Sequence, residues 1–534
     1  MPQHTTTAPV LCTALSFTWP DGTRILDGLS WTADTGRTGL IGRNGSGKST
    51  LLRLIAGHLA PASGTVRVTG DPGYLPQDLT LHPATPVDEI LGVADARAAL
   101  HAIEAGDTDA RHFTTLGDQW DVEERTHATL ARLGLGHIGL DRIVGEVSGG
   151  EAVLLRLAAL LLARPAVLLL DEPTNNLDSH ARELLHQALA DHRGTAVIVT
   201  HDRELLDRVD RIAELRDGTL RTYGGNLTAY EEAVAAEQEA ARRAHTTALA
   251  DVARQRRDQA AARTRQARSA RYGRQMYADN RIDKAGAQTA KRAAQVSRGR
   301  QQAVHDHRLA QAEERLHTAE DRLREDDTLR IDLPDTAVPP HRTVLTCHHA
   351  RLRTGLRLDE LHIHGPERIA LTGRNGSGKT TLLRTLAGHL PPLDGRLTIH
   401  VPLRYLPQDL DLLDAAESVL DGVARLNPHA TAHQIRAGLA RFLFKGTRAE
   451  QPVSTLSGGE RFRATLAALL LADPAPQLLL LDEPTNSLDL ASVTHLAEAL
   501  AGYRGALIVA GHDLPFLRRL GITRRLDMDT PDDP

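Results

Sequence analysis

Cysteine is nearly absent from this 534-residue sequence, which has only Cys12 and Cys347. They form no C-x-x-C spacing, which excludes a cysteine-based zinc module and favours a reducing compartment. Long apolar runs are also missing: Arg156 and Arg164 interrupt the most hydrophobic stretch, 154–170, and a spanning helix needs roughly 18–20 apolar residues. The N-terminus shows no basic-then-apolar signal pattern. We therefore expect a cytoplasmic protein without a membrane span of its own.

Lysine is the next scarce residue, with five in the chain against 58 arginines (63 − 5). Two of the five, Lys48 and Lys379, occupy the same place in a repeated motif, G-x-x-x-x-G-K-[ST]. An ammonium and a guanidinium are not interchangeable, so lysine at these two places indicates a specific requirement. The 26 histidines form no ligand-spaced cluster, and we expect the adjacent His348 and His349 to be a surface feature rather than a metal site.

The repeated motif has the spacing of a phosphate-binding loop. Its glycines let backbone N–H groups converge on an anion, its lysine places a charge on the outer phosphates, and its hydroxyl is placed to hold Mg²⁺. An expected strand, 38–41, precedes the first copy and an expected helix, 50–56, follows it. The second copy lies 331 positions later (379 − 48), which indicates an internal duplication. The nucleotide-binding residues predicted from the loops are Gly42, Asn44, Gly45, Gly47, Lys48, Ser49 and Thr50, and Gly373, Asn375, Gly376, Gly378, Lys379, Thr380 and Thr381.

Each loop is followed by the same further motifs in the same order. A glutamine comes 29 residues after the loop lysine in both copies (77 − 48 and 408 − 379). A Ser-Gly-Gly-Glu sequence then opens a helix, where backbone N–H groups form a second anion-sized nest. These motifs add Gln77, Ser148, Gly149, Gly150 and Glu151, and Gln408, Ser457, Gly458, Gly459 and Glu460 to the predicted nucleotide-binding residues.

An apolar run ending in Asp-Glu comes next in both copies and reads as a central parallel strand buried on both faces. Open α/β sheets bind ligands at the C-terminal ends of such strands. We expect the aspartates, Asp171 and Asp482, to hold Mg²⁺ directly or through water, and the glutamates that follow them to polarise the attacking water. The alternative, a pair of solvated strand-end acids, is weaker because the motifs occur together. A histidine that we expect near the γ-phosphate follows each aspartate by 30 residues (201 − 171 and 512 − 482).

This order of motifs resembles the ATP-binding cassette superfamily. The resemblance implies ATP and Mg²⁺ as cofactors and makes Gln77 the Q-loop residue, 177–178 the D-loop and His201 the switch histidine. It also implies that each Ser-Gly-Gly-Glu signature closes over ATP bound to the opposite cassette. The catalytic residues on this interpretation are Glu172, Glu483, His201 and His512, and the metal-binding residues are Ser49, Gln77, Asp171, Thr380, Gln408 and Asp482.

The residues between the two copies differ in composition. Ala, Arg, Gln and Glu dominate, and proline is absent until Pro334, which favours long helices. A break near 272–280 predicts two antiparallel helices with a short tip. Residues 241–300 carry sixteen Lys/Arg and four Asp/Glu, a net charge of +12, so the rest of the chain carries −17 (−5 − 12). With Tyr272, Met276 and Tyr277 among these arginines, the segment favours RNA contact over a merely solvated coiled coil.

We therefore predict an α/β fold with two tandem ATP-binding cassettes, 1–225 and 334–534, joined by a long antiparallel helical hairpin, 226–333. Such a chain resembles the ABC-F proteins, and segments 281–284 and 289–295 resemble linkers of that group. The resemblance implies an ATPase monomer whose cassettes close on each other at the ribosomal E site. It implies that residues 241–300 reach rRNA and P-site tRNA, and that some members protect the ribosome from antibiotics.

Two other functions compete with this interpretation. One is the motor subunit of a drug exporter with a separate membrane chain, which would have no use for a long basic hairpin. The other is an excision-type DNA-repair ATPase, which would be expected to show zinc-finger cysteines. The copies also depart from each other, since Ala152 follows the first signature and Arg461 the second. The first copy carries 22 extra residues between glutamine and signature (71 − 49), too few for a full ribosome-contacting arm.

Overall fold

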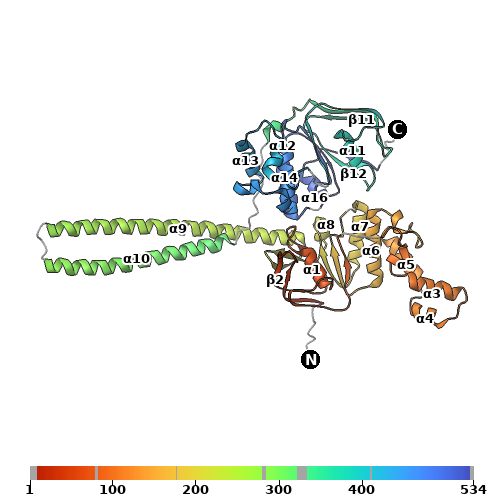
Figure 1. Ribbon diagram of the computed structural model, residues 1–534, viewed down its shortest axis with the longest axis horizontal. Helices are drawn as coiled ribbons and strands as arrows, with labels where there is room; N and C mark the ends of the chain where they lie inside the picture. Colours follow the sequence, from red (N-terminus) through yellow and green to blue (C-terminus); the bar gives the residue numbers. More distant parts are fainter. Residues whose placement is uncertain are drawn as a thin grey trace. The chain divides into compact units, whose positions relative to one another are not determined.

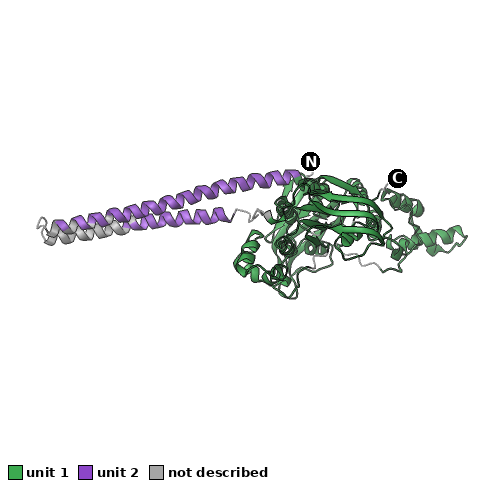
Figure 2. Cartoon of the chain, turned by 90° about the horizontal axis from the view of Figure 1, so that it is seen from above, with its two compact units in different colours: residues 1–227, 327–534 green, residues 228–326 purple. Residues whose placement is uncertain are grey.

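The computed structural model describes residues 9–77, 82–175, 177–278, 284–321, 333–408, 412–486 and 488–529, without some side chains of the hairpin. The break expected near 272–280 is partly wrong, because the chain is helical through residues 272–278. Residues 279–283 lie outside the described residues, and so do the side chains of Met276 and Tyr277. The chain divides into two compact units, one of residues 1–227 and 327–534 and one of residues 228–326 (Figure 2).

The first cassette is built on a six-stranded sheet with the order β5-β6-β7-β3-β8-β9 (Figure 1). Its strands are β3 (Gly36–Ile41), β5 (Gly73–Leu75), β6 (Val167–Asp171), β7 (Thr195–Val199), β8 (Arg211–Arg216) and β9 (Thr219–Gly224). All neighbours pair in parallel except β8 and β9. Every residue of β6 and β7 is buried, as expected for unbroken apolar strands covered on both faces.

An outer antiparallel sheet, β2-β1-β4, covers the loop helix of the first cassette. Its strands are β1 (Val10–Thr18), β2 (Arg24–Ala33) and β4 (Ser63–Val68). The helices are α1 (Lys48–Ile55), α2 (Val87–Ile90), α3 (Ala94–Glu104), α4 (Ala110–Leu116), α5 (Val122–Arg132), η1 (Val144–Glu146), α6 (Gly149–Ala163), α7 (Ser179–Ala190) and α8 (Arg203–Leu206). Leu51 and Leu52 of α1 pack in one core with Leu26 of the outer sheet and Leu40 of the central sheet. Both sheets therefore hold the helix that follows the phosphate loop.

The second cassette repeats this plan. Its central sheet has the order β14-β15-β16-β12-β17, with every neighbouring pair parallel, and its outer sheet has the order β11-β10-β13. The strands are β10 (Thr343–Arg351), β11 (Arg357–His364), β12 (Arg368–Thr372), β13 (Asp394–Ile399), β14 (Leu403–Leu406), β15 (Leu478–Asp482), β16 (Ala506–Ala510) and β17 (Arg524–Asp527). The helices are η2 (Pro334–Thr336), α11 (Lys379–Leu386), α12 (Val419–Arg425), α13 (Ala432–Arg441), η3 (Gly446–Glu450), η4 (Val453–Thr455), α14 (Gly458–Leu470), α15 (Leu490–Ala501) and α16 (Leu514–Arg519).

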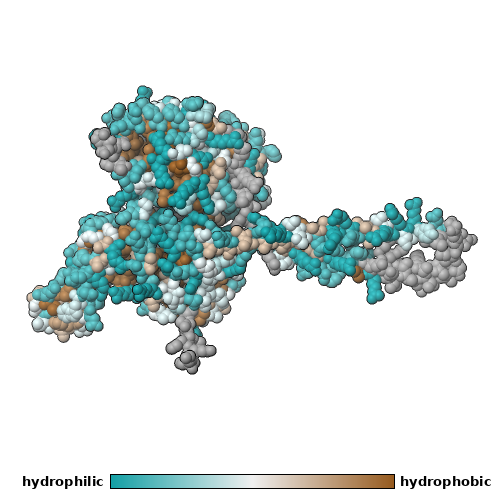
Figure 3. Space-filling view, turned by 180° about the vertical axis from the view of Figure 1, so that it is seen from behind, coloured by the Kyte–Doolittle hydropathy of each residue, from teal (hydrophilic) through white to brown (hydrophobic). Residues whose placement is uncertain are grey.

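The extra residues of the first cassette are accounted for by the helical pair α3 and α4. Helix α5 packs on α6 as α13 packs on α14, whereas α3 and α4 pack mainly on each other. Arg97 of α3 is held by ion pairs to Asp88, Glu123 and Asp141, which fix the base of the pair. The pair projects from the cassette (Figure 1) and exposes apolar surface (Figure 3).

The second unit is a helical hairpin, as predicted. Helix α9 (Leu227–Ala278) has 52 residues and α10 (Lys284–Glu320) has 37. The two are antiparallel: Arg256 of α9 donates to Glu313 of α10, and Gln259 donates to Asp306. Its described surface is largely hydrophilic (Figure 3). Among the described residues, no helix combines the length and the hydropathy that crossing a membrane requires.

Candidate nucleotide-binding sites

Each phosphate-binding loop ends in a glycine that begins a helix. Gly47 (φ +100°) precedes α1 and Gly378 (φ +99°) precedes α11, and neither helix has a side-chain cap. A Cβ added at Gly47 would clash with Ile25 Cγ2, so a larger residue does not fit there. The positive φ angles explain the glycines, and the uncapped helix ends direct N–H groups and a partial positive charge into each loop.

The loop lysines are buried beneath their own loops. Lys48 Nζ donates to Gly42 O (2.8 Å) and Arg43 O (3.1 Å), and Lys379 Nζ donates to Gly373 O (2.6 Å) and to the next carbonyl (3.1 Å). Burial lowers the pKa of both lysines, and nearby carboxylates act against that shift. An anion bound in the loop would likewise stabilise the charged ammonium.

The hydroxyl after each lysine meets the aspartate at the end of the buried strand. Ser49 Oγ donates to Asp171 Oδ1 and Thr380 Oγ1 donates to Asp482 Oδ1, both at 3.1 Å. Burial raises the pKa of both aspartates, and the hydroxyl bonds act against the shift. Hydroxyl and carboxylate oxygens are hard ligands of the kind Mg²⁺ takes in phosphate sites.

Two tyrosines complete these clusters and were missed by motif reasoning. Tyr74 OH lies 3.5 Å from Asp171 Oδ2, and Tyr405 OH donates to Asp482 Oδ2 at 2.9 Å. The sequence did hold a signal, because each tyrosine follows its loop lysine by 26 residues (74 − 48 and 405 − 379). Each tyrosine lies at Oδ2 of its aspartate, whereas the loop hydroxyl donates to Oδ1.

The glutamates that follow these aspartates have a strained backbone. Glu172 (φ +50°) and Glu483 (φ +46°) adopt a left-handed conformation that non-glycine residues rarely take. Glu172 N donates to Val199 O (2.8 Å) and Glu483 N donates to Ala510 O (2.9 Å), which ties each turn to the neighbouring strand. Burial raises the pKa of Glu172 to about 8 and also raises that of Glu483. Strain and an elevated pKa are typical of groups positioned for chemistry.

The two histidines lie against these glutamates. His201 Nε2 is 3.2 Å from Glu172 Oε1, without hydrogen-bond geometry, and His512 Nε2 is 3.5 Å from Glu483 Oε1. Burial lowers the pKa of His201 to about 3 and that of His512 to about 4. Both imidazoles are therefore neutral at pH 7 and do not form salt bridges with the carboxylates.

The signature serines cap the helices that follow them. Ser148 Oγ accepts from Glu151 N (3.3 Å), and Glu151 Oε2 accepts from Ser148 N (2.7 Å), which completes a capping box at the start of α6. Ser457 and Glu460 form the same box at the start of α14. The Ser-Gly-Gly-Glu sequence therefore stabilises the start of each helix, in addition to any contact that it makes with nucleotide.

Residues of each cassette meet the phosphate loop of the other. Asp489 Oδ2 accepts from Asn44 N at 3.1 Å, and Asp178 Oδ2 accepts from Asn375 N at 3.5 Å. A Cβ built at Gly458 would lie 3.5 Å from Asn44 Nδ2, which places the second signature beside the first loop. The family resemblance implies such a pairing for both signatures.

Some predicted residues are not brought into these clusters. Gln77 and Gln408 are exposed, and within the described part of the chain neither is hydrogen-bonded to the loop hydroxyl or the aspartate. Thr50 is buried and Thr381 is half-buried in the first turn of the helices. Trp19, which follows β1 and could have stacked on a base, packs edge-on against Phe17 instead, with ring centroids 5.0 Å apart.

The clusters fit a nucleoside triphosphate with Mg²⁺. Ser46 Oγ and Ser377 Oγ are buried inside the loops and have no hydrogen-bond partner among the described residues. An anion cradled by the loop N–H groups would supply one, since buried hydroxyls are rarely left unpaired. The hydroxyl and aspartate oxygens lie beside it as ligands for the ion.

Comparisons with known proteins place both cassettes in one family. The model of the family described as "ABC transporter" matches residues 26–175 and 356–486. The tylosin resistance ATP-binding protein TlrC of Streptomyces fradiae is 35% identical over 89% of each chain. The energy-dependent translational throttle protein EttA of Escherichia coli K12 is 31% identical over 91% of this chain and 85% of its own. The probable ATP-binding protein YheS of the same strain is 33% identical over 92% of this chain and 75% of its own.

Among solved structures, the archaeal ribosome recycling factor aABCE1, determined with the stalk protein aP1, covers 96% of this chain and 87% of its own. Its TM-score is 0.58 at 18% sequence identity. At this identity the likeness concerns the fold alone, and it supports the tandem arrangement of two cassettes.

Proposed function

The chain belongs to the ABC-F group of the ATP-binding cassette family, and from this premise we propose that it is a Mg²⁺-dependent ATPase that binds the ribosome and acts on translation. The observation that carries the proposal is the combination of two nucleotide clusters with a basic hairpin in one chain. The names of TlrC and EttA, one a resistance protein and one a translational throttle, support it.

In the proposed mechanism, Lys48 and the N-terminal end of α1 neutralise the outer phosphates of one ATP, and Lys379 and α11 do the same for the other. Ser49 and Asp171 would hold Mg²⁺, which neutralises charge on the β- and γ-phosphates when bound. Gln77 and Gln408, exposed and adjacent to stretches outside the described residues, would join the ions when the sites close.

Glu172 and Glu483 would each accept a hydrogen bond from the attacking water and orient it toward the γ-phosphate. His201 and His512, neutral and in contact with these glutamates, would position them and donate to the phosphate. Closure would bring residues 457–460 over the first ATP and residues 148–151 over the second. Both serines can keep the bonds of their capping boxes while their hydroxyl protons turn to a phosphate oxygen, and Ser457 would give up the bond that its hydroxyl donates to Glu460 Oε2 (2.8 Å).

We further propose that the hairpin contacts rRNA and P-site tRNA while the cassettes occupy the E site. Arg263, Arg265, Arg268 and Arg271 are exposed on α9, and Tyr272 exposes 65% of its surface nearby. Guanidinium groups contact phosphates and an exposed ring stacks on an unpaired base, so the surface suits RNA. An exporter motor has no evident use for such a hairpin.

Ribosome co-sedimentation of the Glu172→Gln/Glu483→Gln variant tests the proposal. This variant should hold ATP without turning it over, so ATP should drive it into the 70S pellet and ADP should not. Replacing Arg263, Arg265, Arg268 and Arg271 with glutamate should abolish pelleting. Each lost phosphate contact should also reduce the salt slope of binding by about 0.7–0.9.

The matched control replaces the same four arginines with lysine, which keeps the charge and the helix propensity. The lysine variant should pellet, with some loss where guanidinium geometry matters. If the ATP-bound Gln variant does not associate with ribosomes at any salt concentration, the ribosome role is wrong. ATP-dependent recovery with a membrane fraction instead would favour the exporter motor.

Antibiotic resistance is the finer part of the proposal and rests on the relation to TlrC. Expression in a tylosin-sensitive host should raise the inhibitory concentration of tylosin, and the Glu172→Gln/Glu483→Gln variant should not. Unchanged sensitivity with verified expression would remove tylosin resistance from the proposal and leave the ribosome role to the sedimentation test.

A further inference from the structure

The outer sheet of the second cassette has one apolar face and one face rich in histidine. On β10 and β11, the buried face carries Leu345, Cys347, Leu361 and Ile363, all of them fully buried or nearly so. Because side chains alternate along a strand, several residues next to these four in the sequence point to solvent. Those residues include His348 of β10 and Glu360 and His362 of β11.

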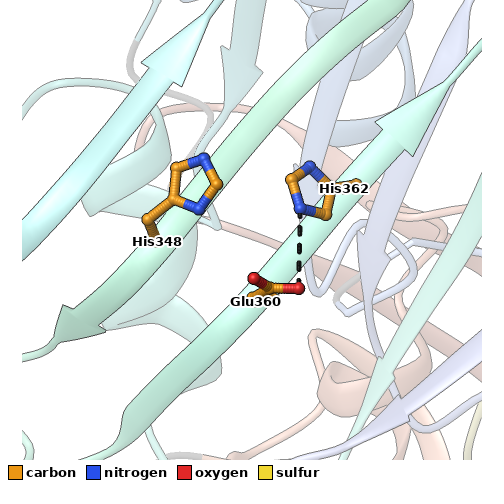
Figure 4. Close-up of side chains that lie close together, drawn as sticks. All are labelled: His348, Glu360 and His362. Atoms are coloured by element: carbon orange, nitrogen blue, oxygen red, sulfur yellow. Dashed lines mark ion pairs between the residues drawn. The ribbon is translucent and has the colours of Figure 1, made fainter.

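Strand register brings these three side chains together. His348 lies directly opposite Glu360, and His362 lies opposite Thr346, two residues before His348. The rings of His348 and His362 have centroids 5.3 Å apart at an interplanar angle of 68°. His362 Nε2 is 3.9 Å from Glu360 Oε2, and one ligand atom of each residue lies within 4.8 Å of the other two. Figure 4 shows the two rings and the carboxylate converging from neighbouring strands.

We propose that His348, Glu360 and His362 form a zinc site on the exposed face of the β10–β11 ribbon, with water completing the coordination. Two imidazoles and one carboxylate are a ligand set that Zn²⁺ takes with an open position. The Zn–N distance is about 2.0–2.1 Å, so small side-chain rotations would bring the three ligand atoms onto one ion. The backbone of two hydrogen-bonded strands already fixes their spacing.

Two neighbouring side chains, Arg396 and His364, would influence where the ion binds and how His362 is oriented. Arg396 of β13 lies opposite His348 on the other side of β10, so the ion would be held toward β11. His364 stacks on His362 with centroids 6.3 Å apart at 10°, which restricts the orientation of that ring. An ion bound by both strands would cross-link β10 to β11 in the folded chain only, and would raise its unfolding temperature.

A zinc titration of the full-length chain without a histidine tag tests the proposal. The chelator-treated protein is titrated with Zn²⁺ against a chromophoric chelator, with excess Mg²⁺ present to saturate the nucleotide sites. We expect one tight equivalent, and Co²⁺ in its place should give visible absorption bands characteristic of a low-symmetry site. His348→Ala, Glu360→Gln and His362→Ala should each weaken Zn²⁺ binding at least about tenfold, the loss that even outer partners of a ligand cause.

His433→Ala is the matched control, because His433 is exposed on α13 of the same cassette and outside the cluster. It should leave the affinity and the Co²⁺ spectrum unchanged. The three ligand variants should unfold at the wild-type temperature without zinc and lose the zinc-dependent rise, which separates ligation from folding. Equal zinc affinity in the wild type and in the variant lacking all three ligands would overturn the proposal, as would a loss confined to His433→Ala.

Discussion

The two nucleotide sites use the same groups at the phosphates and differ in the groups around them. Loop hydroxyl and strand aspartate are 3.1 Å apart in both. In contrast, the tyrosine donates to the aspartate at 2.9 Å in the second site, while the first pair is 3.5 Å apart. Lys379 also contacts His512 Nε2 at 3.1 Å in the second site, whereas neither ring nitrogen of His201 is hydrogen-bonded to a described residue. The hydroxyl and aspartate that would hold Mg²⁺ therefore have the same spacing in both sites, whereas the tyrosine and histidine around them do not.

The interface between the cassettes is also unequal. Asp489, which reaches the first loop, is buried, while Asp178, which reaches the second loop, is half-exposed. Four residues later, Arg182 stands in the first cassette and Val493 in the second, and both line one pocket with His512 and Glu172. Arg182 acts against the rise in pKa of Glu483, which has burial as its main cause. The duplicated sites are therefore expected to turn over at different rates.

Replacing the two glutamates should have the largest effect on ATP turnover. It tests whether the two sites carry out the same chemistry. The Glu172→Gln/Glu483→Gln variant should lose about 100-fold or more in turnover, because a positioned base contributes 10²–10⁴-fold. Binding of ATP should remain, since the amide keeps the size of the carboxyl group. Steady-state phosphate release and nucleotide binding are the measurements. The single variants apportion turnover between the sites, and full activity of the double variant would refute the assignment of both glutamates.

The aspartates at the interface should show the next largest effect. Asp489 Oδ1 accepts from Ser492 N (2.8 Å) and Oδ2 from Asn44 N (3.1 Å). Burial would raise its pKa, but these bonds lower it, so it is charged at pH 7. Asp489→Asn removes a buried charge-assisted bond of about 1.5–3 kcal/mol, so turnover should fall roughly ten- to a hundredfold. Asp178→Asn, with its longer 3.5 Å contact to Asn375 N, should cost less, and an equal loss in both variants would contradict the asymmetry.

Motif spacing predicted the loop glycines, lysines, hydroxyls and strand acids because each belongs to a short segment whose backbone is locally determined. The helix after the first loop, expected over 50–56, begins at Lys48, two residues earlier, because the lysine itself forms the first turn. Long apolar runs predicted β6 and β15, which are buried at every residue. Local sequence was therefore enough to predict most residues of each cluster.

Contacts across strands and between cassettes were not predictable in this way. The tyrosine beside each aspartate depends on the pairing of β5 with β6 and of β14 with β15. His348 was expected to be a surface feature with His349, yet the register places it beside Glu360 and His362, while His349 approaches Asp359. A one-residue shift in register would separate that cluster, and no spacing in the sequence specifies the register.

The smallest predicted effect is on the pH dependence of stability, and it comes from His186 of α7. The counterpart of His186 in α15 is Ala497 (186 − 178 equals 497 − 489). His186 is 2% exposed, and neither ring nitrogen has a hydrogen-bond partner among the described residues. Burial lowers its pKa, and Asp202 and Glu183 act against that shift. The folded chain therefore keeps His186 neutral while the unfolded chain protonates it near pH 6.5.

Because the unfolded state binds this proton first, the free energy of unfolding should fall as the pH drops below about 6.5, by at most ~1.4 kcal/mol per pH unit for one group. His186→Ala, which copies the second cassette, should unfold with a smaller difference between pH 7.5 and 5.5 than the wild type, whatever its stability at pH 7.5. Urea unfolding of the full chain at both pH values measures this difference. Since other histidines contribute equally to both proteins, identical pH dependence would mean that the pKa of His186 is not lowered in the folded chain, and that this contrast between the cassettes is wrong.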